Sequence, residues 1–318
     1  MTRCKWLLFV VSVLSYAATY GQEDTTSFLS DVETELTSED SLSIFNLIDS
    51  LLQQADSESS QLAIRLSYNS NVLSTGRTLG INNFGLAPGI SYYHKSGLYG
   101  DLSGYWSKDF DPSYYLTVAS VGYMHDFSKH FSIMAGYDRY FYGVGEDHYV
   151  PYKNTLSVTP VLEFKPLVLS ATYSFYFGDA HVHRIMPALG VMLEKRKLFG
   201  IDRIAITPSF FTLFGNEVFT EIEFASPPKT LREGLSNLRT YNSWFKPPVE
   251  KNINVFGVMN YAISVPLTIS HKSWSFSFSY TYNIPKALRD EPLTISESSY
   301  LSGSLTYLIN LKRNKLSL

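Results

Sequence analysis

Residues 273–282, with the sequence SWSFSFSYTY, alternate small hydroxyl residues with aromatic residues without interruption. Because successive side chains of a β-strand point to opposite faces, this segment predicts a strand with one aromatic face and one Ser/Thr face. The core of a soluble β-sandwich is filled largely by Val, Leu and Ile, whereas about ten residues with an aromatic face suit a tilted strand that crosses a bilayer. The pattern therefore predicts a transmembrane strand.

The same period of two recurs along the chain. In residues 61–70, for example, Ile64 and Leu66 fall on one face and Arg65 falls on the other. The expected strands are residues 61–70, 85–95, 98–107, 114–125, 131–142, 155–164, 167–177, 183–194, 202–214, 252–264, 273–282 and 299–311. We therefore expect an all-β fold, a transmembrane antiparallel up-and-down β-barrel of about 12 strands.

The connections between these strands alternate in length. The short ones are expected at residues 96–97, 126–130, 165–166, 195–201 and 265–272, and the longest of the others spans residues 215–251. Outer-membrane barrels have short periplasmic turns and longer external loops, and an even number of strands leaves both ends of the chain on one side. We expect a cell outer-membrane location with both termini periplasmic and the long loops extracellular.

Four prolines fall inside expected strands, at Pro88, Pro160, Pro187 and Pro208. A closed barrel has no free edge at which a missing backbone N–H is harmless. β-Bulges are one way to absorb such residues, so the registers around these prolines stay open.

The N-terminus predicts export. Arg3 and Lys5 precede an apolar stretch at residues 6–18, and small residues follow, which is typical of a cleaved signal peptide over residues 1–21. The only cysteine, Cys4, lies within that signal, so the mature chain offers no thiol or disulfide. We expect residues 22–60 to form a periplasmic acidic tail with one short amphipathic helix at residues 41–54, and residues 61–318 to form the barrel.

The helix expected over Ser41–Gln54 places its apolar residues on one face. Two interpretations stay open for it. The helix lies across the periplasmic rim, or it plugs the barrel or docks a periplasmic or secretion partner.

Composition supports the barrel and excludes other classes. Aromatic residues make up 15% of the chain, mean hydropathy is −0.05, and no run of about 18 apolar residues follows residue 18. In strands that alternate apolar and polar residues, the hydropathies of the two faces average to about zero, so a hydropathy scan does not detect them. The formal net charge of −3 gives no reason to expect nucleic acid as a partner.

The inward faces of the strands are mainly small and polar, with scattered charges. The candidates for a selectivity site in the lumen are Arg65, Asp101, Asp138, Glu163 and Arg184, with Glu194 as a further inward charge. These charges either form a constriction that selects solutes or pair with one another and brace the wall.

An enzyme is the rival class, because some barrels carry hydrolase sites. The seven histidines fall mostly in turns and loops, and there is no Gly-x-Ser-x-Gly elbow. Residues 146–148 (EDH) and the pair His181 and His183 are weak metal candidates. We expect no catalytic residue, no metal site and no cofactor.

The longest connection is the best place for a specific function, because long loops without structure are unusual unless functional. Residues 217–224 alternate and predict an extension of the preceding strand beyond the membrane, and residues 229–240 predict a short helix. This loop enters the pore, caps it or binds a partner, or it is an ordinary surface loop.

The signal end Tyr20-Gly21-Gln22, the helix at residues 40–52 (DSLSIFNLIDSLL) and the Tyr-rich strands resemble those of outer-membrane β-barrel proteins of the Bacteroidota type. The resemblance implies a Gram-negative outer membrane with lipid as the surrounding partner, and it identifies no activity. One departure is the C-terminal KRNKLSL at residues 312–318, where many barrels end on an aromatic assembly signal.

The function expected from the barrel and its polar lumen is a narrow, porin-like channel or recognition pore for small polar solutes. The alternative is a non-transport structural or secretion-accessory barrel, and an outer-membrane hydrolase comes third.

Overall fold

Period-two segments form strands along the whole described chain. The computed structural model describes residues 59–70, 85–108, 112–143, 152–223, 227–289 and 296–311. Its elements are β1 (Ser60–Asn69), β2 (Gly85–Tyr93), β3 (Leu98–Trp106), β4 (Tyr114–Ser128), β5 (Phe131–Tyr142), β6 (Tyr152–Phe164), β7 (Leu167–Gly178), β8 (His181–Val191), β9 (Leu193–Leu198), β10 (Ile201–Ile206), β11 (Ser209–Glu223), α3 (Leu231–Tyr241), β12 (Val249–His271), β13 (Trp274–Pro285) and β14 (Ser298–Leu311).

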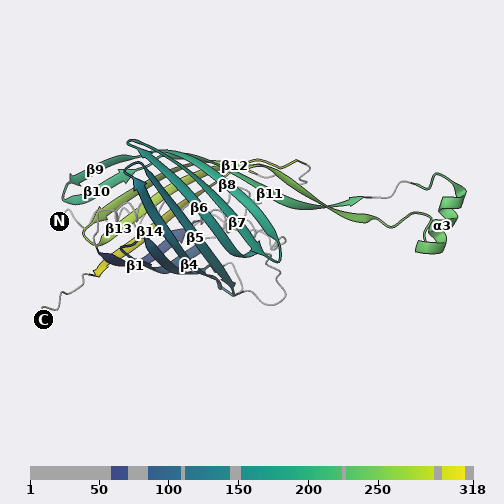
Figure 1. The fold of residues 1–318 in the computed structure, drawn as a ribbon, viewed down its shortest axis with the longest axis horizontal. Helices are drawn as coiled ribbons and strands as arrows, with labels where there is room; N and C mark the ends of the chain where they lie inside the picture. Colours follow the sequence, from purple (N-terminus) through teal and green to yellow (C-terminus); the bar gives the residue numbers. More distant parts are fainter. Residues whose placement is uncertain are drawn as a thin grey trace.

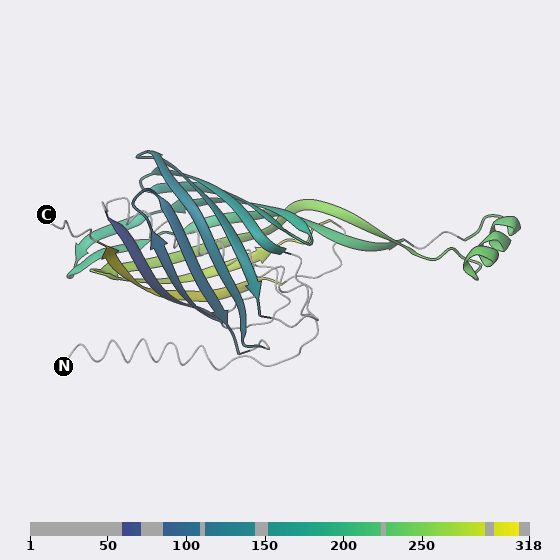
Figure 2. The ribbon, with the colours of Figure 1, turned by 60° about the horizontal axis from the view of Figure 1, so that its bottom comes forward.

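These strands close into one antiparallel barrel (Figures 1 and 2). From β1 to β8 and from β11 to β14 each strand pairs with the next one in sequence, β1 pairs with β14, and β11 pairs with both β8 and β12. The segments β9 and β10 continue β8 and β11 as a hairpin, so the closed barrel has 12 strands. The expected all-β, up-and-down barrel is confirmed.

Longer and shorter connections alternate over most of the described chain, and the expected short turns gather at one end of the barrel. The β7–β8 connection is an exception, because it is only Asp179–Ala180 although it lies at the other end. Three of the expected short turns are shorter than the sequence predicted, and the expected turn at residues 126–130 shrinks to Lys129–His130 because β4 continues to Ser128. The expected turns at residues 195–201 and 265–272 shrink to Phe199–Gly200 and Lys272–Ser273, because β9, β10 and β12 continue into them. The strands can extend because Arg203 and Ile204 of β10 pair with β9 on one side and with β12 on the other.

The prolines are absorbed without β-bulges. Pro88, Pro160 and Pro187 sit in continuous register opposite Leu66, Ile133 and Ala171. In the pairing of β2 with β3 and of β6 with β7, the residue pairs at Pro88 and Pro160 are missing, as expected where a backbone N–H is absent. Pairing resumes beyond each proline in the same register.

Pro208 is different, because it lies in the break between β10 and β11, where its carbonyl oxygen accepts a hydrogen bond of 2.9 Å from the Val191 N–H. The register shifts of the barrel lie elsewhere, at β3–β4, β4–β5, β6–β7 and β11–β12.

The two faces of each strand separate as the alternation predicts. Large apolar side chains stand on the outside of the barrel on successive strands: Ile64, Leu66, Ile90, Leu102, Val121, Leu156, Val158, Leu169, Leu189, Ile263, Val265, Phe276, Phe278 and Leu305. The intervening residues face inward and are mostly small or polar, as with Ser91, Thr159 and Thr281. An apolar outer belt with no protein partner is the surface that lipid covers.

The strands β11 and β12 run on beyond the barrel as a two-stranded ribbon that carries α3 at its far end (Figures 1 and 2). β8 pairs with β11 only as far as Gly215, and β13 pairs with β12 only as far as Asn260, whereas β11 and β12 stay paired up to Glu223 and Val249. The extension expected at residues 217–224 and the helix expected at 229–240 are both confirmed.

No helix in the described part of the chain is long and apolar enough to span a bilayer. The expected signal peptide, the acidic tail, the helix at residues 41–54, the segment 146–148 and the C-terminal 312–318 lie outside the described residues.

Candidate functional site: the inner face of the barrel

A row of polar side chains crosses five neighbouring strands on the inner face. Ser91 on β2 is the cross-strand partner of Asp101 on β3, and Asp101 is that of Ser120 on β4. Ser120 in turn lies opposite Asp138 on β5, and Asp138 lies opposite Thr155 on β6. Register therefore brings two of the predicted carboxylates, Asp101 and Asp138, into one band of the wall.

Asp101 is the centre of a hydrogen-bonded network. Its Oδ1 lies 3.3 Å from Nη2 of Arg65, and its Oδ2 accepts a 2.6 Å hydrogen bond from the Ser103 hydroxyl. Ser91 also donates to Oδ1, and Arg65 Nη2 donates to Ser103 Oγ at 2.9 Å. Both charges of the pair are largely buried, so the negative charge of Asp101 is balanced where it stands.

A glycine allows this contact between β1 and β3. Arg65 lies opposite Gly89 of β2, and a Cβ at Gly89 would stand 3.1 Å from Nη2 of Arg65 and 2.7 Å from Oγ of Ser103. The missing side chain lets the guanidinium of Arg65 cross over β2 and reach Asp101 on β3.

Asp138 differs from Asp101 because its partners are neutral. The hydroxyl of Ser120 hydrogen bonds to its carboxylate, and no ion pair to Asp138 occurs within the described part of the chain. Of the two aspartates in this band, Asp138 is therefore the one whose charge faces the lumen without a neighbouring cation.

The other predicted charges lie apart from this band and are paired. Glu163 forms an ion pair of 3.4 Å with Lys165 beside a short turn. Arg184 Nη2 lies 3.1 Å from Glu217 Oε1, and its Nη1 donates to the carbonyl oxygen of Asn216. The five predicted site residues thus do not form a single cluster.

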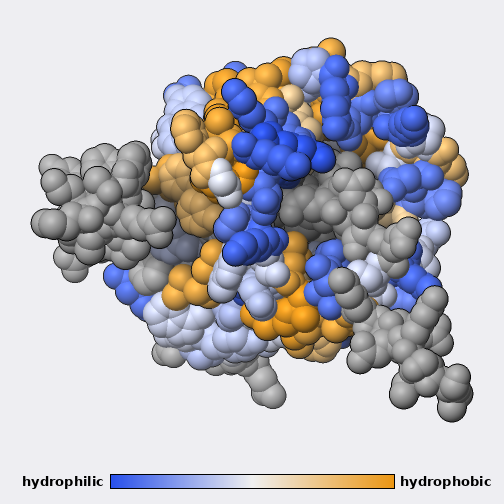
Figure 3. Space-filling model, turned by 90° about the vertical axis from the view of Figure 1, so that its left-hand side faces the viewer, coloured by the Kyte–Doolittle hydropathy of each residue, from blue (hydrophilic) through white to orange (hydrophobic). Residues whose placement is uncertain are grey.

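Glu194, Arg196 and Arg203 form a further charged group on the β9–β10 hairpin. Lys195 and Arg196 belong to the turn expected at residues 195–201, but in the structure they lie in β9. Figure 3 views the molecule from the end that carries this hairpin and the other short turns, and shows hydrophilic side chains gathered there with hydrophobic ones between them.

Paired hydroxyl and amide side chains line the wall from β12 through β14 and also between β6 and β7. The hydrogen-bonded pairs are Ser277–Ser304 at 2.7 Å, Ser279–Ser302 at 2.8 Å, Ser264–Thr281 at 3.0 Å, Asn260–Asn283 at 3.0 Å and Thr159–Thr172 at 3.0 Å. The sequence identified their faces but not these partners, because the partners depend on register.

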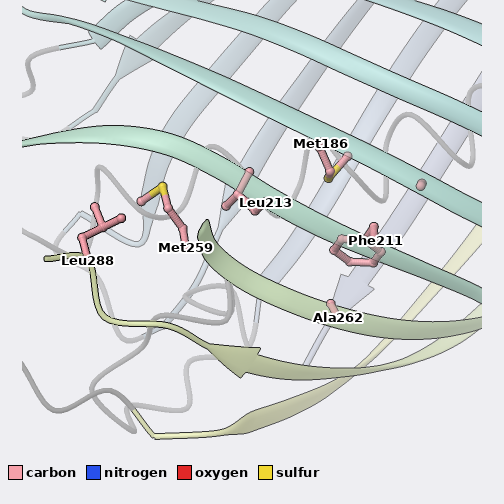
Figure 4. Close-up of a cluster of buried hydrophobic side chains, with 7 residues drawn as sticks. Met186, Phe211, Leu213, Met259, Ala262 and Leu288 are labelled. Carbon is pink, nitrogen blue, oxygen red and sulfur yellow. The ribbon is translucent and has the colours of Figure 1, made fainter. Parts of the chain in front are cut away.

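An apolar cluster covers the inner face of β8, β11 and β12. It consists of Met186, Ala188, Phe211, Leu213, Met259, Ala262 and Leu288 (Figure 4). Leu288 comes from the connection after β13 and lies against this wall, where the neighbouring Lys286 N–H donates to the Met259 carbonyl oxygen at 2.9 Å. The register shift between β11 and β12 lies at Met259, so Met259 and Asn260 are both buried.

A second buried cluster joins strands β4 to β8 towards the long-loop end. Its members are Tyr115, Leu116, Tyr140, Tyr152, Tyr176 and Val182. The crowding of aromatic residues at these strand ends, which includes Tyr115, Tyr140 and Tyr176, predicts an outer girdle at the membrane interface. In the structure these three tyrosines are packed within the protein instead.

The histidines make local contacts. His94 Nδ1 lies 2.7 Å from the Ser96 hydroxyl within one short turn, and His183 Nδ1 lies 2.8 Å from the Tyr173 hydroxyl. Across the described ranges there is no group of three or more His, Cys, Asp or Glu side chains placed to hold a metal ion.

A closed antiparallel barrel with an apolar exterior and a polar inner wall defines a class, the transmembrane β-barrels of outer membranes. The chain matches no protein-family profile and no curated protein sequence. Among solved structures it is similar to the KdgM porin, with 9% identity, 78% of this chain and 98% of that chain covered, and a TM-score of 0.41.

Two further similarities are comparable. For the NanC porin the identity is 10%, the coverage is 79% of this chain and 100% of that chain, and the TM-score is 0.38. For LpxR from Salmonella typhimurium the identity is 12%, the coverage is 78% of this chain and 99% of that chain, and the TM-score is 0.37.

Proposed function

We propose that the protein is a narrow channel or recognition pore for small polar solutes across an outer membrane. The observation that carries this proposal is the hydroxyl and amide lining, in which Ser277–Ser304 and Ser279–Ser302 satisfy one another along the wall. The interior of a 12-stranded barrel is wider than the side-chain-filled interior of an eight-stranded barrel, and short side chains of this kind take up the least of it. Water and polar solutes suit the space next to such a wall.

The two buried hydrophobic clusters restrict the proposed route of a solute through the barrel. The apolar cluster around Met259 covers one side of the wall, and the cluster around Tyr140 covers part of the long-loop end. The proposed path therefore follows the polar side, from the hydroxyl rows of β13 and β14 to the band that contains Asp101 and Asp138.

The charged side chains on the inner face predict an ion preference for the proposed path. Arg65 balances Asp101, and Lys165 and Glu217 balance Glu163 and Arg184. Asp138 adds a negative charge that no cation pairs with among the described residues, and a fixed charge a few ångströms from a water-filled path is only partly screened by salt. The pore should therefore favour cations and solutes that carry a positive group.

The sidedness belongs to the same proposal. Short turns would lie in the periplasm of a Gram-negative cell, of the Bacteroidota type by resemblance, and the α3 ribbon would stand outside the cell. Under the alternative, a structural or secretion-accessory barrel, the ribbon would serve a partner and the lumen would stay closed.

Planar-bilayer recording in a salt gradient tests the proposal. Wild-type protein should conduct and prefer cations, and Asp138→Asn should lower that preference with the side-chain size unchanged. Asp179→Asn is the matched control, because Asp179 pairs with Lys153 at 2.9 Å in an exposed turn between β7 and β8. It should leave the preference unchanged.

Two outcomes would contradict the proposal, one its channel and the other its charge selection. One is the absence of conductance both in the mature chain and in a chain that lacks residues 22–58, and this result favours the accessory alternative. The other is equal ion preference in wild type and Asp138→Asn, which removes the recognition role of this aspartate.

A further inference from the structure

The end of the β11–β12 ribbon carries a small folded unit that stands away from the barrel (Figures 1 and 2). Beyond Gly215 the ribbon has no neighbouring strand, and it leads to α3 and to the residues that follow it, 242–248. We call α3 with residues 227–230 and 242–248 the tip. Its position gives it a function separate from the barrel wall.

The helix of the tip is preformed. An isolated helix of 11 residues is marginal in water, so α3 needs local support. The Thr230 hydroxyl accepts a 3.2 Å hydrogen bond from the Glu233 N–H and caps the helix. The Glu233 carboxylate reaches back to accept a 3.1 Å hydrogen bond from the Lys229 N–H, one residue before the N-cap. At the other end Asn242 adopts φ 53° and its N–H donates to the Leu238 carbonyl oxygen.

One side of the helix is covered by the tip itself. A Cβ at Gly234 would meet the Trp244 ring at 2.4 Å, so the indole lies directly on the helix backbone there. Asn237 Nδ2 donates a 3.1 Å hydrogen bond to the carbonyl oxygen of Trp244 and fixes the returning chain. The caps and this contact hold α3 folded while another side stays uncovered.

The uncovered side is an apolar stripe. Leu231, Leu235 and Leu238, spaced by four and three residues, are 72%, 55% and 42% exposed. The aromatic side chains of Tyr241 and Phe245 are also exposed beside it. Exposure of such an apolar stripe to water is unfavourable, so its presence on a preformed, well-capped helix indicates that the stripe binds another surface.

The charge of the tip indicates which surface. Lys229, Arg232, Arg239 and Lys246 are basic and Glu233 is the one acidic residue in residues 227–248, whereas the whole chain has a net charge of −3. Arg232 and Arg239 flank the leucine stripe on one side, at helical positions about 80–100° from Leu231. Basic side chains beside an apolar stripe, with Trp and Phe nearby, are typical of helices that lie in the interface of an anionic bilayer.

We propose that the tip is a membrane-docking element that binds the surface of an anionic lipid bilayer, with its leucines inserted and its arginines on the lipid phosphates. A second copy of the chain is a poorer occupant, because two tips would bring like charges together. A protein groove would suit the leucines, but it gives no reason for aromatic side chains at the margin, which lipid headgroups favour.

The test uses the full mature chain in neutral nanodiscs, mixed with separate vesicles that contain brominated phosphatidylglycerol or brominated phosphatidylcholine. Trp244 is the tryptophan of the tip, whereas Trp106 and Trp274 lie in β3 and β13 of the barrel. Quenching by bromine in the added vesicles therefore reports contact of the tip. We expect quenching by the anionic vesicles and a loss of it as salt is raised.

Variants on the two sides of α3 sharpen the test. The double change Leu235→Asp and Leu238→Asp should reduce binding by more than about tenfold, because each removes an inserted side chain and adds repulsion. Arg232→Gln and Arg239→Gln should each weaken binding by about fivefold. Ser236→Asp adds one negative charge, half of that added by the leucine double change, on the polar face and should weaken binding by about fivefold at most.

Binding to neither type of vesicle would overturn the proposal and leave a protein groove as the occupant. Equal binding to both types would overturn the selection by charge. Equal loss in Ser236→Asp and the leucine variant would overturn the role of the stripe. Conductance through the barrel should be the same in all these variants, so failure here is distinct from failure of the channel.

Discussion

The outer and inner faces of the barrel wall are built by alternate residues of the same strands, yet they are stabilised in different ways. On β13, Phe276, Phe278 and Tyr280 face outward, 40–44% exposed, with lipid as their partner. Ser277 and Ser279, one residue away, each hydrogen bond to one named serine of β14. The outer face depends on transfer into lipid, and the inner face depends on specific pairs.

This difference predicts which substitutions each face tolerates. The outer face should tolerate any apolar side chain but no charge, because lipid has no preferred shape and does not solvate an ion. The inner face should tolerate a charge that reaches water but not the loss of a partner to a buried polar group. We make four predictions, in order from the largest expected effect on folding to the smallest.

Phe278→Arg should have the largest effect. A cation that faces lipid near the midplane costs about 2–4 kcal/mol, so insertion and stability should both fall. Ser277→Arg places the same side chain on the inner face and should fold, which heat-modifiable gel mobility and urea unfolding in lipid vesicles will measure. Equal damage at both positions would contradict the separation of the faces.

Asp101→Asn should cost about 1–3 kcal/mol, because it leaves the buried guanidinium of Arg65 without its counter-charge. The double variant Arg65→Met and Asp101→Asn should recover part of this loss, since replacing both members of a buried ion pair is far less costly than removing one. Urea unfolding of the three variants checks the order. If the double variant were the least stable, the pair would not be the source of the effect.

Ser304→Ala should cost about 0.5–1.5 kcal/mol, because it removes the 2.7 Å hydrogen bond between the hydroxyls of Ser304 and Ser277. The neighbouring change Leu305→Ile, on the outer face, keeps an apolar side chain in lipid and should change the unfolding free energy by less than about 0.5 kcal/mol. The opposite order of these two effects would argue that Ser304 does not need its partner.

Insertion of a protease site near Ser236 or near Ser128 should have little effect on folding, because both lie in exposed segments outside the barrel wall or at its end. The site at Ser236, in the tip, should be cleaved on intact cells, and the site at Ser128, beside a short turn, should be protected. Cleavage at Ser128 alone would show that the assigned orientation is reversed.

Much of the fold could be predicted from the sequence because the signal is local. Alternation over ten residues gave the strands and the faces of Ile64, Arg65 and Ser277, and the ends of most strands agree within three residues with the structure. The largest differences come from Lys195–Lys197 and from residues 265–271. Charged or Pro-containing segments look like turns until pairing with β10 and β13 holds them in strands.

The inner face could be predicted only in part. That Arg65 and Asp101 point inward follows from parity, but their contact needs the register of three strands and the gap left by Gly89. Leu288 packs on the wall near Met259, 29 positions away in the sequence. No local sequence pattern predicts this contact. Long-range register, and not residue type, decides which charges pair.

Cysteine labelling at Ser277 and Phe278 tests most directly whether the inner face is wet. Cys4 lies in the expected signal, so the mature chain is a cysteine-free background. In lipid vesicles, Ser277→Cys should react with a charged, membrane-impermeant thiol reagent, and Phe278→Cys should not, although Phe278 is the more exposed of the two in the protein alone. Labelling at Phe278 alone, or at neither position in a folded barrel, would contradict a water-filled lumen.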